Sequence, residues 1–461
     1  MQIFFCVCSK KESFICTYQK KVVPLQPQSC SILKTQMKVL CSLQKTQIRY
    51  FCSLNQTNYN MKNLIDKHVR YYKQTPMMII RQCGSEINWN VPLLALRGPK
   101  GVGKSTIMRQ YIRLHYSVSD RSVLYCSCDG AYFASHTLLD LADQFYKTGG
   151  KHLFLDEIHK YPNWSREIKE MTDLYSDMRI VISGSSLLSL QQGDADLSRR
   201  CINHDIQGLS FREFLLFYKN IDLPKYTLEQ ILANPWTLAE EVNNQCRPLQ
   251  YFAEYLQYGY YPYFMQLKNT VDYYSAIENT ISYIIDDELP RICKVSVENT
   301  RKIKALVNIF ANSVPYDIDI KRLSVQSELQ RATILEYLNY LDKAKIIRLV
   351  YSDYINAKKM QKPDKVLMDN SNMLYTLAVQ VPNIGTVREC FASNQLSFSH
   401  LVEYGKNHGD FKVDGKYTFE VGGVDKDYEQ IADLPNSYIL ADDMEFPYGH
   451  KLPLWMIGFL Y

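Results

Sequence analysis

The sequence predicts an α/β protein, and three observations along the chain support this fold class. Between about residues 90 and 185, short continuous apolar runs alternate with helical patterns, as expected for parallel strands that are covered on both faces. From 211 to about 295 the pattern is helical and rich in Tyr and Phe. The last hundred residues, 362–461, are strand-prone and contain Gly-Asp, Asp-Gly and Gly-Gly turns. A parallel-sheet core, a helical segment and a second α/β region should therefore follow one another.

The composition is that of a globular protein whose 461 residues suffice for about three domains. Hydrophobic residues make up 46% of the chain and charged residues 22%, and no apolar run approaches the roughly 18 residues that a membrane span needs. Residues 1–60 hold eight Lys or Arg against one Glu, whereas the rest of the chain is close to neutral. A membrane protein and a basic nucleic-acid surface over the whole chain are thus excluded.

Residues 1–60 are expected to form a disordered N-terminal tail, and whether this tail is part of the native protein stays open. They lack sustained periodicity and are rich in Gln, Ser, Lys and Cys, so they cannot easily bury a core. Their six cysteines form no CxxC pair and the chain total of 13 is odd, which favours free thiols in a reducing cytoplasm. Met61 is a candidate start, because it opens a helical pattern with Leu64, His68 and Tyr72 on one face.

The core is expected over residues 61–210, and its elements follow in order. Four apolar runs predict its strands, and a helical pattern through Ile107, Met108 and Ile112 follows the first of them. The four runs are VPLLAL (91–96), SVLYCS (122–127), HLFLD (152–156) and RIVISG (179–184).

A glycine-rich loop follows the first strand directly and precedes that helix. GPKGVGKS fits the pattern GxxxxGK[ST], and strand, loop and helix are the context that a phosphate-binding P-loop requires. The glycines let backbone N–H groups wrap phosphates, to which the helix N-terminus adds its own field. Lys104 should reach the β and γ phosphates of ATP, and the Ser105 hydroxyl should ligate Mg²⁺. The expected nucleotide-binding residues are Gly98, Pro99, Lys100, Gly101, Val102, Gly103, Lys104, Ser105 and Thr106.

Two adjacent acidic residues end the third predicted strand, HLFLD. Asp156 can hold Mg²⁺ through water from the carboxyl end of the strand, and Glu157 can polarise the attacking water. The second carboxylate favours hydrolysis over transfer to another acceptor. The alternative is a charge pair at a helix N-terminus. The letters DEIH also resemble a helicase box, but the chain shows none of the other helicase motifs.

The order of these motifs resembles one family. GPKGVGKST, FLDEIHKYPNWSREIK, ISGSS, DLSRR and GLSFREFL are similar to the motifs of prokaryotic AAA-type ATPases that carry a C-terminal restriction-endonuclease-like domain of unknown function. The resemblance runs from about Met61 to Tyr461 and is far more specific than a P-loop alone. It implies that ATP and Mg²⁺ bind at Gly98–Thr106 and Asp156, with Glu157 as the hydrolytic residue, but it implies no defined biological substrate.

Two further elements gain a role from this resemblance. AAA-type ATPases place a polar residue that senses the γ-phosphate at a strand end, where this chain has Ser183, with Ser185 and Ser186 behind it. The alternative is a simple turn, which Ser and Gly also favour. Arg199 and Arg200 could stabilise transition-state charge within the chain or across a homo-oligomer interface. A solvated surface is the alternative for this arginine pair.

A helical lid is expected after the core. Its aromatic run from Tyr255 to Phe264 should be buried rather than serve as a platform for stacked bases. Three helical patterns and the strand IIRLVY then predict a winged-helix domain. The expected domains are 61–210 for the core, 211–296 for the lid, 297–355 for the winged helix and 356–461 for a nuclease-like domain.

The winged-helix segment is the candidate DNA-binding element. Its last helical pattern leaves Gln330, Arg331 and Lys345 exposed for a groove of DNA. Few basic residues are available there, so DNA binding and a plain packing role both stay open.

The last domain is expected to have a nuclease-like fold without nuclease activity. By the resemblance, Asp410 and Glu420 would hold a metal ion, helped by Glu389 from a preceding helix. The active pattern requires Lys two residues after Glu420, but Gly422 stands there, and Lys426, four residues further on, is expected to lie too far from the acidic residues. Without that lysine, the transition state loses much of its charge stabilisation.

Together these motifs predict a cytoplasmic AAA-type ATPase that binds ATP and Mg²⁺ and hydrolyses ATP to drive or time a conformational change. Lys104, Asp156 and Glu157 would position the hydrolysis. Two alternatives stay open: a DNA-associated nucleotide switch with slow turnover, and an ATP-regulated nuclease that uses Lys426. A protein partner and a homo-oligomer are compatible with each of these.

Overall fold

A computed structural model describes residues 17–18, 21–22, 61–187, 197–267, 269–313, 319–352, 362–406 and 408–461. By its internal contacts the chain divides into two units, Met1–Asp66 and Lys67–Tyr461. In the first unit, β1 (Thr17–Tyr18) pairs antiparallel with β2 (Lys21–Val22), and the rest of the expected tail lies outside the described residues. Residues 61–74 are helical, as the sequence predicts.

The core of the second unit is a parallel sheet with the strand order β4-β5-β6-β3-β7. Its strands are β3 (Leu93–Arg97), β4 (Val123–Ser127), β5 (His152–Asp156), β6 (Arg179–Gly184) and β7 (Ile202–Asp205). The first four are the predicted apolar runs, and each is buried almost throughout. The edge strand β7 is not predicted, because its sequence INHD is polar and mostly exposed.

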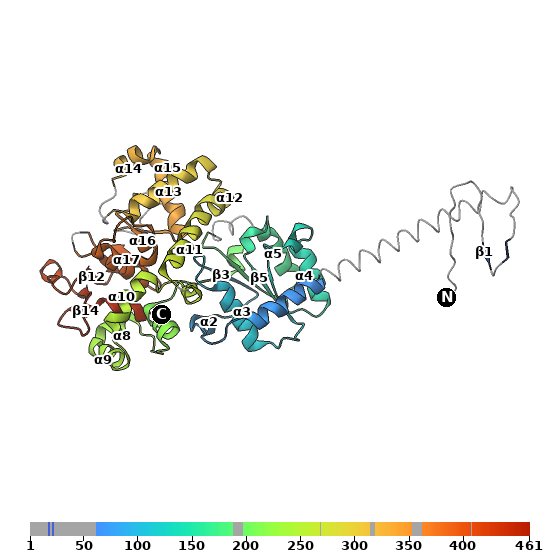
Figure 1. Ribbon diagram of the computed structural model, residues 1–461, viewed down its shortest axis with the longest axis horizontal. Coiled ribbons are helices and arrows are strands. Elements are labelled where there is room, and N and C mark those ends of the chain that lie inside the picture. The colour runs from blue at the N-terminus through green and yellow to red at the C-terminus, as the bar shows by residue number, and fades with distance from the viewer. Residues whose placement is uncertain are drawn as a thin grey trace. The chain divides into compact units, whose positions relative to one another are not determined.

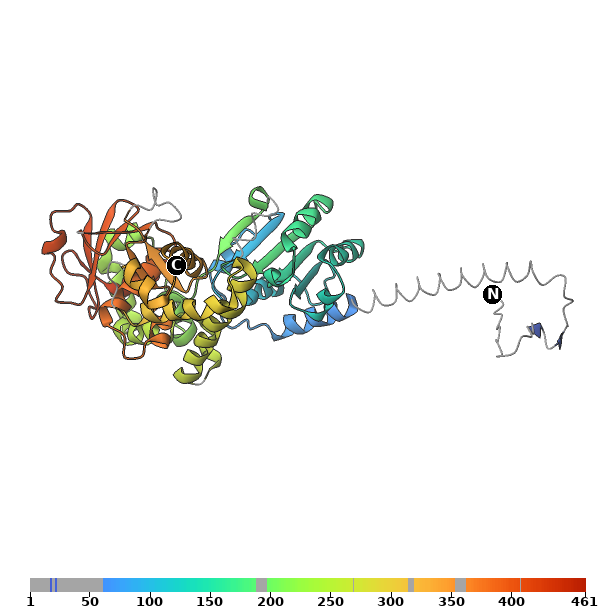
Figure 2. The same ribbon diagram turned by 90° about the horizontal axis from the view of Figure 1, so that it is seen from above.

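Helices cover both faces of this sheet (Figures 1 and 2). They are α2 (Cys83–Glu86), α3 (Lys104–His115), α4 (Leu138–Lys147) and α5 (Trp164–Leu174), with the short 3-10 turns η2 (Ala131–Ala134), η3 (Ile158–Lys160) and η5 (Leu197–Arg199). Each of α4 and α5 buries one apolar face and presents a charged face outward, as the period of an amphipathic helix requires.

The segment that was expected as a lid is helical in the structure. Its elements are α7 (Phe211–Phe214), η6 (Leu215–Lys219), α8 (Leu228–Ala233), α9 (Pro235–Gln245), α10 (Pro248–Tyr258), η7 (Pro262–Gln266), α11 (Thr270–Tyr283), η8 (Ile284–Glu288) and α12 (Leu289–Cys293). Tyr255, Tyr260 and Tyr261 of the aromatic run are buried, which confirms the prediction that this run is core.

Three helices and a β-hairpin come next. They are α13 (Val297–Ala311), α14 (Ile320–Ser327) and α15 (Arg331–Lys343), followed by β8 (Ile347–Val350) and β9 (Lys365–Met368). The two strands pair antiparallel, so this hairpin crosses the boundary that the sequence suggested between residues 355 and 356. On α15, Gln330 and Arg331 at its start are exposed as expected, whereas Lys345 after its end is only half-exposed.

The last region combines two helices with a mixed sheet. The helices are α16 (Ser371–Leu377) and α17 (Ile384–Leu396), and the strands are β10 (Val402–Tyr404), β11 (Phe411–Val413), β12 (Tyr417–Gly422), β13 (Ser437–Ala441) and β14 (Lys451–Pro453), with η9 (Glu429–Ile431) and η10 (Leu454–Phe459). Strands β10, β11 and β12 pair antiparallel, whereas β12, β13 and β14 pair parallel. Helix α17 packs on β12, and η10 packs on α17 and α7.

One continuous apolar core runs through all these parts of the second unit. It includes Leu94 of the parallel sheet, Phe252 of α10, Leu338 of α15 and Trp455 of η10. Helices α10 and α11 contact α16, so the helical segment is packed against the last region as well as leading out of the parallel sheet. Among the described helices, none is long and apolar enough to cross a membrane.

Candidate functional site

The predicted P-loop connects β3 to α3 and is shaped by glycines with positive φ. Gly98 has φ 154°, Gly101 φ 91° and Gly103 φ 98°. A Cβ on Gly98 would lie 2.0 Å from the carbonyl oxygen of Ile206, which no side chain tolerates. Gly103 is the left-handed residue immediately before α3. Backbone conformation and close approach therefore both require glycine in this loop.

Lys104 begins α3 and is buried, with 6% of its surface exposed. Its Nζ donates hydrogen bonds of 2.8 Å to the carbonyl oxygens of Gly98 and Pro99. Burial lowers the pKa of Lys104, while Glu157 and Asp156 oppose that shift. The ammonium thus lies against its own loop and faces the acidic end of β5.

Asp156 ends β5 and is almost fully buried. Its Oδ2 accepts a 2.5 Å hydrogen bond from the Tyr125 hydroxyl, and its Oδ1 accepts from the Ser183 hydroxyl and from the Glu157 N–H at 3.2 Å. All of these groups donate, which suits an ionised carboxylate. Oδ2 has a second lone pair, so Asp156 and Ser105 fit the role of holding Mg²⁺ through water and hydroxyl. Sequence reasoning missed Tyr125, because it lies in the middle of an apolar strand.

Glu157 lies in the left-handed region, with φ 54° and ψ 40°. Its N–H also donates to Ser183 Oγ at 3.2 Å, and its side chain is 23% exposed. Its Oε2 lies 3.6 Å from His159 Nε2. The unusual backbone turns the carboxylate out of the strand direction, and strain of this kind is concentrated at functional sites.

Ser183 lies at the end of β6, between β5 and β3, which is the place expected for the γ-phosphate sensor. Its hydroxyl is already donated to Asp156, and the side chain is fully buried. Ser185 and Ser186 follow, and neither hydroxyl has a hydrogen-bond partner among the described residues. These two hydroxyls are therefore better placed than Ser183 to bind a ligand.

Arg199 and Arg200 are not brought to the P-loop. Both precede β7, so they lie at the edge where the parallel strands begin, whereas the P-loop follows the end of β3. Arg200 Nη2 instead pairs with Asp173 Oδ1 at 3.0 Å, near the end of α5. Both arginine residues are exposed. The expectation that one of them acts within its own chain is corrected by this placement, while action across a homo-oligomer interface stays a prediction.

A buried arginine outside the predicted motifs, Arg81, hydrogen bonds to the backbone of the P-loop. Arg81 makes a bidentate pair with Glu213, with distances of 2.9 Å from Nε to Oε1 and 2.7 Å from Nη2 to Oε2. The same guanidinium donates to the carbonyl oxygens of Val102, Gln207 and Gly208 at 2.8 to 3.1 Å. The SFREF motif thus has a structural function, because its Glu213 anchors the cation that holds the P-loop.

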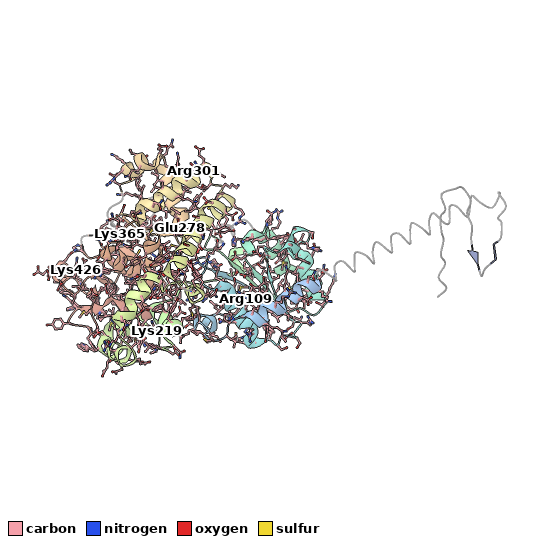
Figure 3. The ribbon with its side chains drawn as sticks, viewed as in Figure 1. Arg109, Lys219, Glu278, Arg301, Lys365 and Lys426 are labelled. Atoms are coloured by element: carbon pink, nitrogen blue, oxygen red, sulfur yellow. The ribbon has the colours of Figure 1, made fainter. Side chains whose placement is uncertain are left out.

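The last region brings charged side chains of opposite sign together. The cluster consists of Lys365 on β9, Glu389 on α17, Asp410 before β11, Glu420 on β12 and Lys426 after it. Lys365 Nζ pairs with Glu389 and lies 3.3 Å from Asp410 Oδ1, and Lys426 Nζ lies 2.5 Å from Glu420 Oε1. Burial raises the pKa of Glu389 to about 7, and it raises that of Glu420 as well. Both lysines lie in this part of the chain (Figure 3).

The expectation that Lys426 lies too far from the acidic residues is wrong. A Cβ on Gly422 would lie 2.8 Å from both Cβ and Cγ of Lys426, so the Lys426 side chain occupies the space that a side chain at 422 would take. Lys365 was missed because it precedes the acidic residues on a separate strand. Within the described parts of the chain, no group of three or more His, Cys, Asp or Glu residues is arranged to hold a metal ion.

Comparisons with known proteins show what two parts of the chain are similar to. Residues 90–215 match a family model described as an AAA domain. That range contains the P-loop, Asp156 and Glu157, so this part of the chain is similar to an AAA domain. Residues 249–381 match a domain of unknown function, DUF8612. This second match runs from α10 to just after α16, so it covers part of the helical segment, the three helices and the hairpin, and crosses both boundaries that the sequence suggested there.

Two curated relatives are uncharacterized proteins of Methanocaldococcus jannaschii. The chain is 25% identical to MJ1637 over 287 residues, which cover 59% of this chain and 60% of that protein. It is 26% identical to MJ1544 over 274 residues, which cover 55% of each. The chain thus spans little more than half the length of these relatives.

Two solved structures also match part of the chain. AMPPCP-bound DnaA from Aquifex aeolicus is 12% identical, with a TM-score of 0.22, and the match covers 57% of this chain and 86% of DnaA. PCH-2 of C. elegans is 13% identical, with a TM-score of 0.21, and the match covers 55% of this chain and 62% of PCH-2. Scores this low do not establish a shared fold.

Proposed function

We propose that this protein binds ATP with Mg²⁺ and hydrolyses it to drive or time a conformational change. The observation that supports this most strongly is the strand order, because β5 with Asp156 and Glu157 and β3 with the P-loop flank β6. The carboxyl ends of these parallel strands meet at one edge of the sheet, which is where open α/β sheets bind their ligands.

Each residue of this edge has a distinct proposed role. The backbone N–H groups of the P-loop and the Lys104 ammonium would bind the β and γ phosphates, once Lys104 leaves the carbonyl oxygens of Gly98 and Pro99. Ser105 and Asp156 would hold Mg²⁺, which neutralises charge that develops on the phosphates. Glu157 would accept a proton from the attacking water.

Two substitutions test this proposal. Lys104→Ala should abolish tight ATP binding in calorimetry, whereas Glu157→Gln should bind ATP normally and lose about 10²- to 10⁴-fold in turnover. Glu170→Gln is the matched control, because Glu170 is an exposed residue on α5. Unchanged ATP affinity in Lys104→Ala, or unchanged turnover in Glu157→Gln, contradicts the assignment.

A partner for the conformational change is proposed from the three helices and the hairpin. Gln330 and Arg331 are exposed at the start of α15, the helix that a winged-helix domain would place in a DNA groove. Affinity for duplex DNA at 50 mM and 200 mM salt tests this, because contacts to phosphates weaken steeply with salt. A protein partner is the alternative if no salt-dependent affinity is found.

Phosphodiester cleavage by the last region is a second candidate function. The observation that favours it is the position of Lys426, whose side chain passes over Gly422 and reaches Glu420. A lysine at this point would offset the negative charge that gathers in a phosphodiester transition state. Against it, Lys365 and Lys426 already form ion pairs with all three carboxylates, so a metal ion would have to displace at least one lysine.

Incubation of the full chain with Mg²⁺ or Mn²⁺, ATP and linear or single-stranded DNA separates the two cases. Cleavage that is lost in Lys426→Ala and Asp410→Ala, but kept in Lys412→Ala, supports a nuclease. Lys412 is suited as the control because it is exposed on β11. Intact DNA in every reaction supports a non-catalytic domain, as the glycine at 422 suggested.

A further inference from the structure

A buried carboxylate from the helical segment lies next to His159, which is also close to the proposed hydrolytic residue Glu157. Glu288 is the last residue of η8 and is 1% exposed. Its Oε1 lies 3.6 Å from His159 Nε2, and the same nitrogen lies 3.6 Å from Glu157 Oε2. Glu288 therefore lies on the side of the site where the attacking water and the γ-phosphate are expected.

The environment of this carboxylate is unusual. Among the described residues, neither oxygen of Glu288 and neither ring nitrogen of His159 has a hydrogen-bond partner. A buried carboxylate without hydrogen bonds is costly unless nearby positive charge compensates for it. Burial raises the pKa of Glu288, but the adjacent His159 and, to a smaller extent, Lys100 lower it, so that the pKa lies below its usual value. Its charge is therefore balanced by groups of the nucleotide site.

Neighbours of Glu288 in the helical segment also cover the P-loop. Lys100 Nζ lies 3.5 Å from the centroid of the Tyr283 ring, just before η8. A Cβ on Gly101 would lie 2.7 Å from Tyr263 Cε1, so this ring lies directly against the loop. In these contacts the helical segment packs against the Lys100 ammonium and the backbone at Gly101. Both belong to the P-loop, which is expected to contact the phosphates of ATP.

We propose that Glu288 is an internal competitor of the γ-phosphate of ATP: its carboxylate balances the positive charge around the P-loop, and ATP binding displaces it together with η8 and α12. This inference rests on the proposed function, because it assumes that ATP binds at the P-loop. The Glu288 carboxylate and the γ-phosphate are both negative, so they would repel each other strongly if both lay beside the P-loop lysines in a buried, low-dielectric site. A ligand shifts a conformation only by its differential affinity for the two states, and Glu288 supplies that difference.

The inference predicts that the site distinguishes ATP from ADP. ADP lacks the γ-phosphate, so it would leave Glu288 beside His159. ATP would not, and the helical segment would therefore change position with the state of the nucleotide. Because α10 and α11 contact α16, the displacement would be passed on to the last region.

Calorimetric titration of the full chain with Mg²⁺ and either ATP or ADP tests the proposal. Glu288→Gln, which keeps the size of the side chain and removes its charge, should bind ATP about tenfold more tightly or better, with ADP affinity changed less than about threefold. Glu278→Gln is the matched control, because Glu278 lies on the adjoining helix α11 and is exposed (Figure 3). It should bind both nucleotides as wild type does.

A second measurement keeps the proposal testable if Glu288→Gln folds poorly. Hydrogen exchange of wild-type peptides over residues 284–293 should speed up with ATP and not with ADP. Equal ATP affinity in wild type and Glu288→Gln, or a fall in turnover alone, overturns the inference, and so does unchanged exchange. If wild type and Lys104→Ala bind ATP equally, the proposed function itself fails, which is a different result.

Discussion

Removal of the Arg81 side chain should destabilise the second unit far more than removal of another arginine with nearly the same ion-pair geometry. The Arg81–Glu213 pair is bidentate, and its side chains are 5% and 3% exposed. Arg97 pairs with Asp205 in the same way, at 2.9 and 3.0 Å, but these side chains are 20% and 68% exposed. The two pairs therefore differ in burial, and Arg81 also donates to three carbonyl oxygens.

The expected magnitudes follow from that difference. Arg81→Leu leaves Glu213 as a buried charge without its partner and deprives three carbonyl oxygens of a donor, so it should lower the free energy of unfolding by about 3–5 kcal/mol. Arg97→Leu should cost less than about 1 kcal/mol. Urea unfolding followed by circular dichroism measures both. The double variant Arg81→Leu with Glu213→Leu should be more stable than Arg81→Leu alone, because it removes the stranded charge.

The reasoning is refuted if Arg81→Leu lowers the free energy of unfolding by no more than Arg97→Leu does. It is also refuted if the double variant loses the sum of what Arg81→Leu and Glu213→Leu lose separately. Because Arg81 Nη1 also holds the carbonyl of Val102 in the P-loop, Arg81→Leu should in addition weaken ATP binding in protein that remains folded.

Three further perturbations follow from single contacts. Tyr125→Phe removes the 2.5 Å hydrogen bond from the Tyr125 hydroxyl to Asp156. This variant should still bind ATP, but the Mg²⁺ concentration needed for half-maximal turnover should rise by about three- to tenfold. An unchanged Mg²⁺ requirement would count against the role of Asp156. His68 accepts a 3.0 Å hydrogen bond from the Tyr125 N–H, and burial lowers the pKa of His68 from 6.5 to about 4. In this pH range the unfolded chain therefore binds a proton more readily than the folded chain. The free energy of unfolding should consequently fall as the pH drops from about 6.5 toward 4. His68→Gln should show a smaller fall over that range in urea unfolding, and an equal fall assigns the acid sensitivity to other groups. Gly98→Ala should prevent stable folding or ATP binding, because the new Cβ would meet a carbonyl oxygen. Gly149→Ala, with φ 90° and no described heavy atom within 4 Å of the new Cβ, should cost only about 1–2 kcal/mol of backbone strain in thermal unfolding. Similar costs for both variants would contradict the steric argument.

Local patterns predicted much of the core. The four apolar strands could be assigned because continuous burial on both faces leaves a continuous apolar run, and the P-loop because its glycines serve a conformation that few other residues adopt. Strand β7 could not, because one polar edge strand has no such pattern. Glu288 and His159 meet only through tertiary packing, so no spacing in the sequence joins them.

The side chains of the last region show the same limit in another form. Spacing suggested that Lys426 was too distant, yet the missing side chain of Gly422 is what lets Lys426 fold back over the strand. For Arg200, adjacency to the core motifs suggested a catalytic position, but the direction of β7 sends it to the opposite edge of the sheet. The number of residues between two positions therefore did not predict whether their side chains meet in the folded protein.

The hairpin of β8 and β9 joins two functions that were assigned to separate domains. β8 directly follows the helix proposed to meet DNA, and β9 carries Lys365, whose ammonium pairs with Glu389 and Asp410. Because β8 and β9 pair along their length, a displacement of α15 that β8 follows would also shift Lys365 relative to Glu389 and Asp410. Binding of a partner at α15 would in this way be linked to the charge balance among Lys365, Glu389 and Asp410.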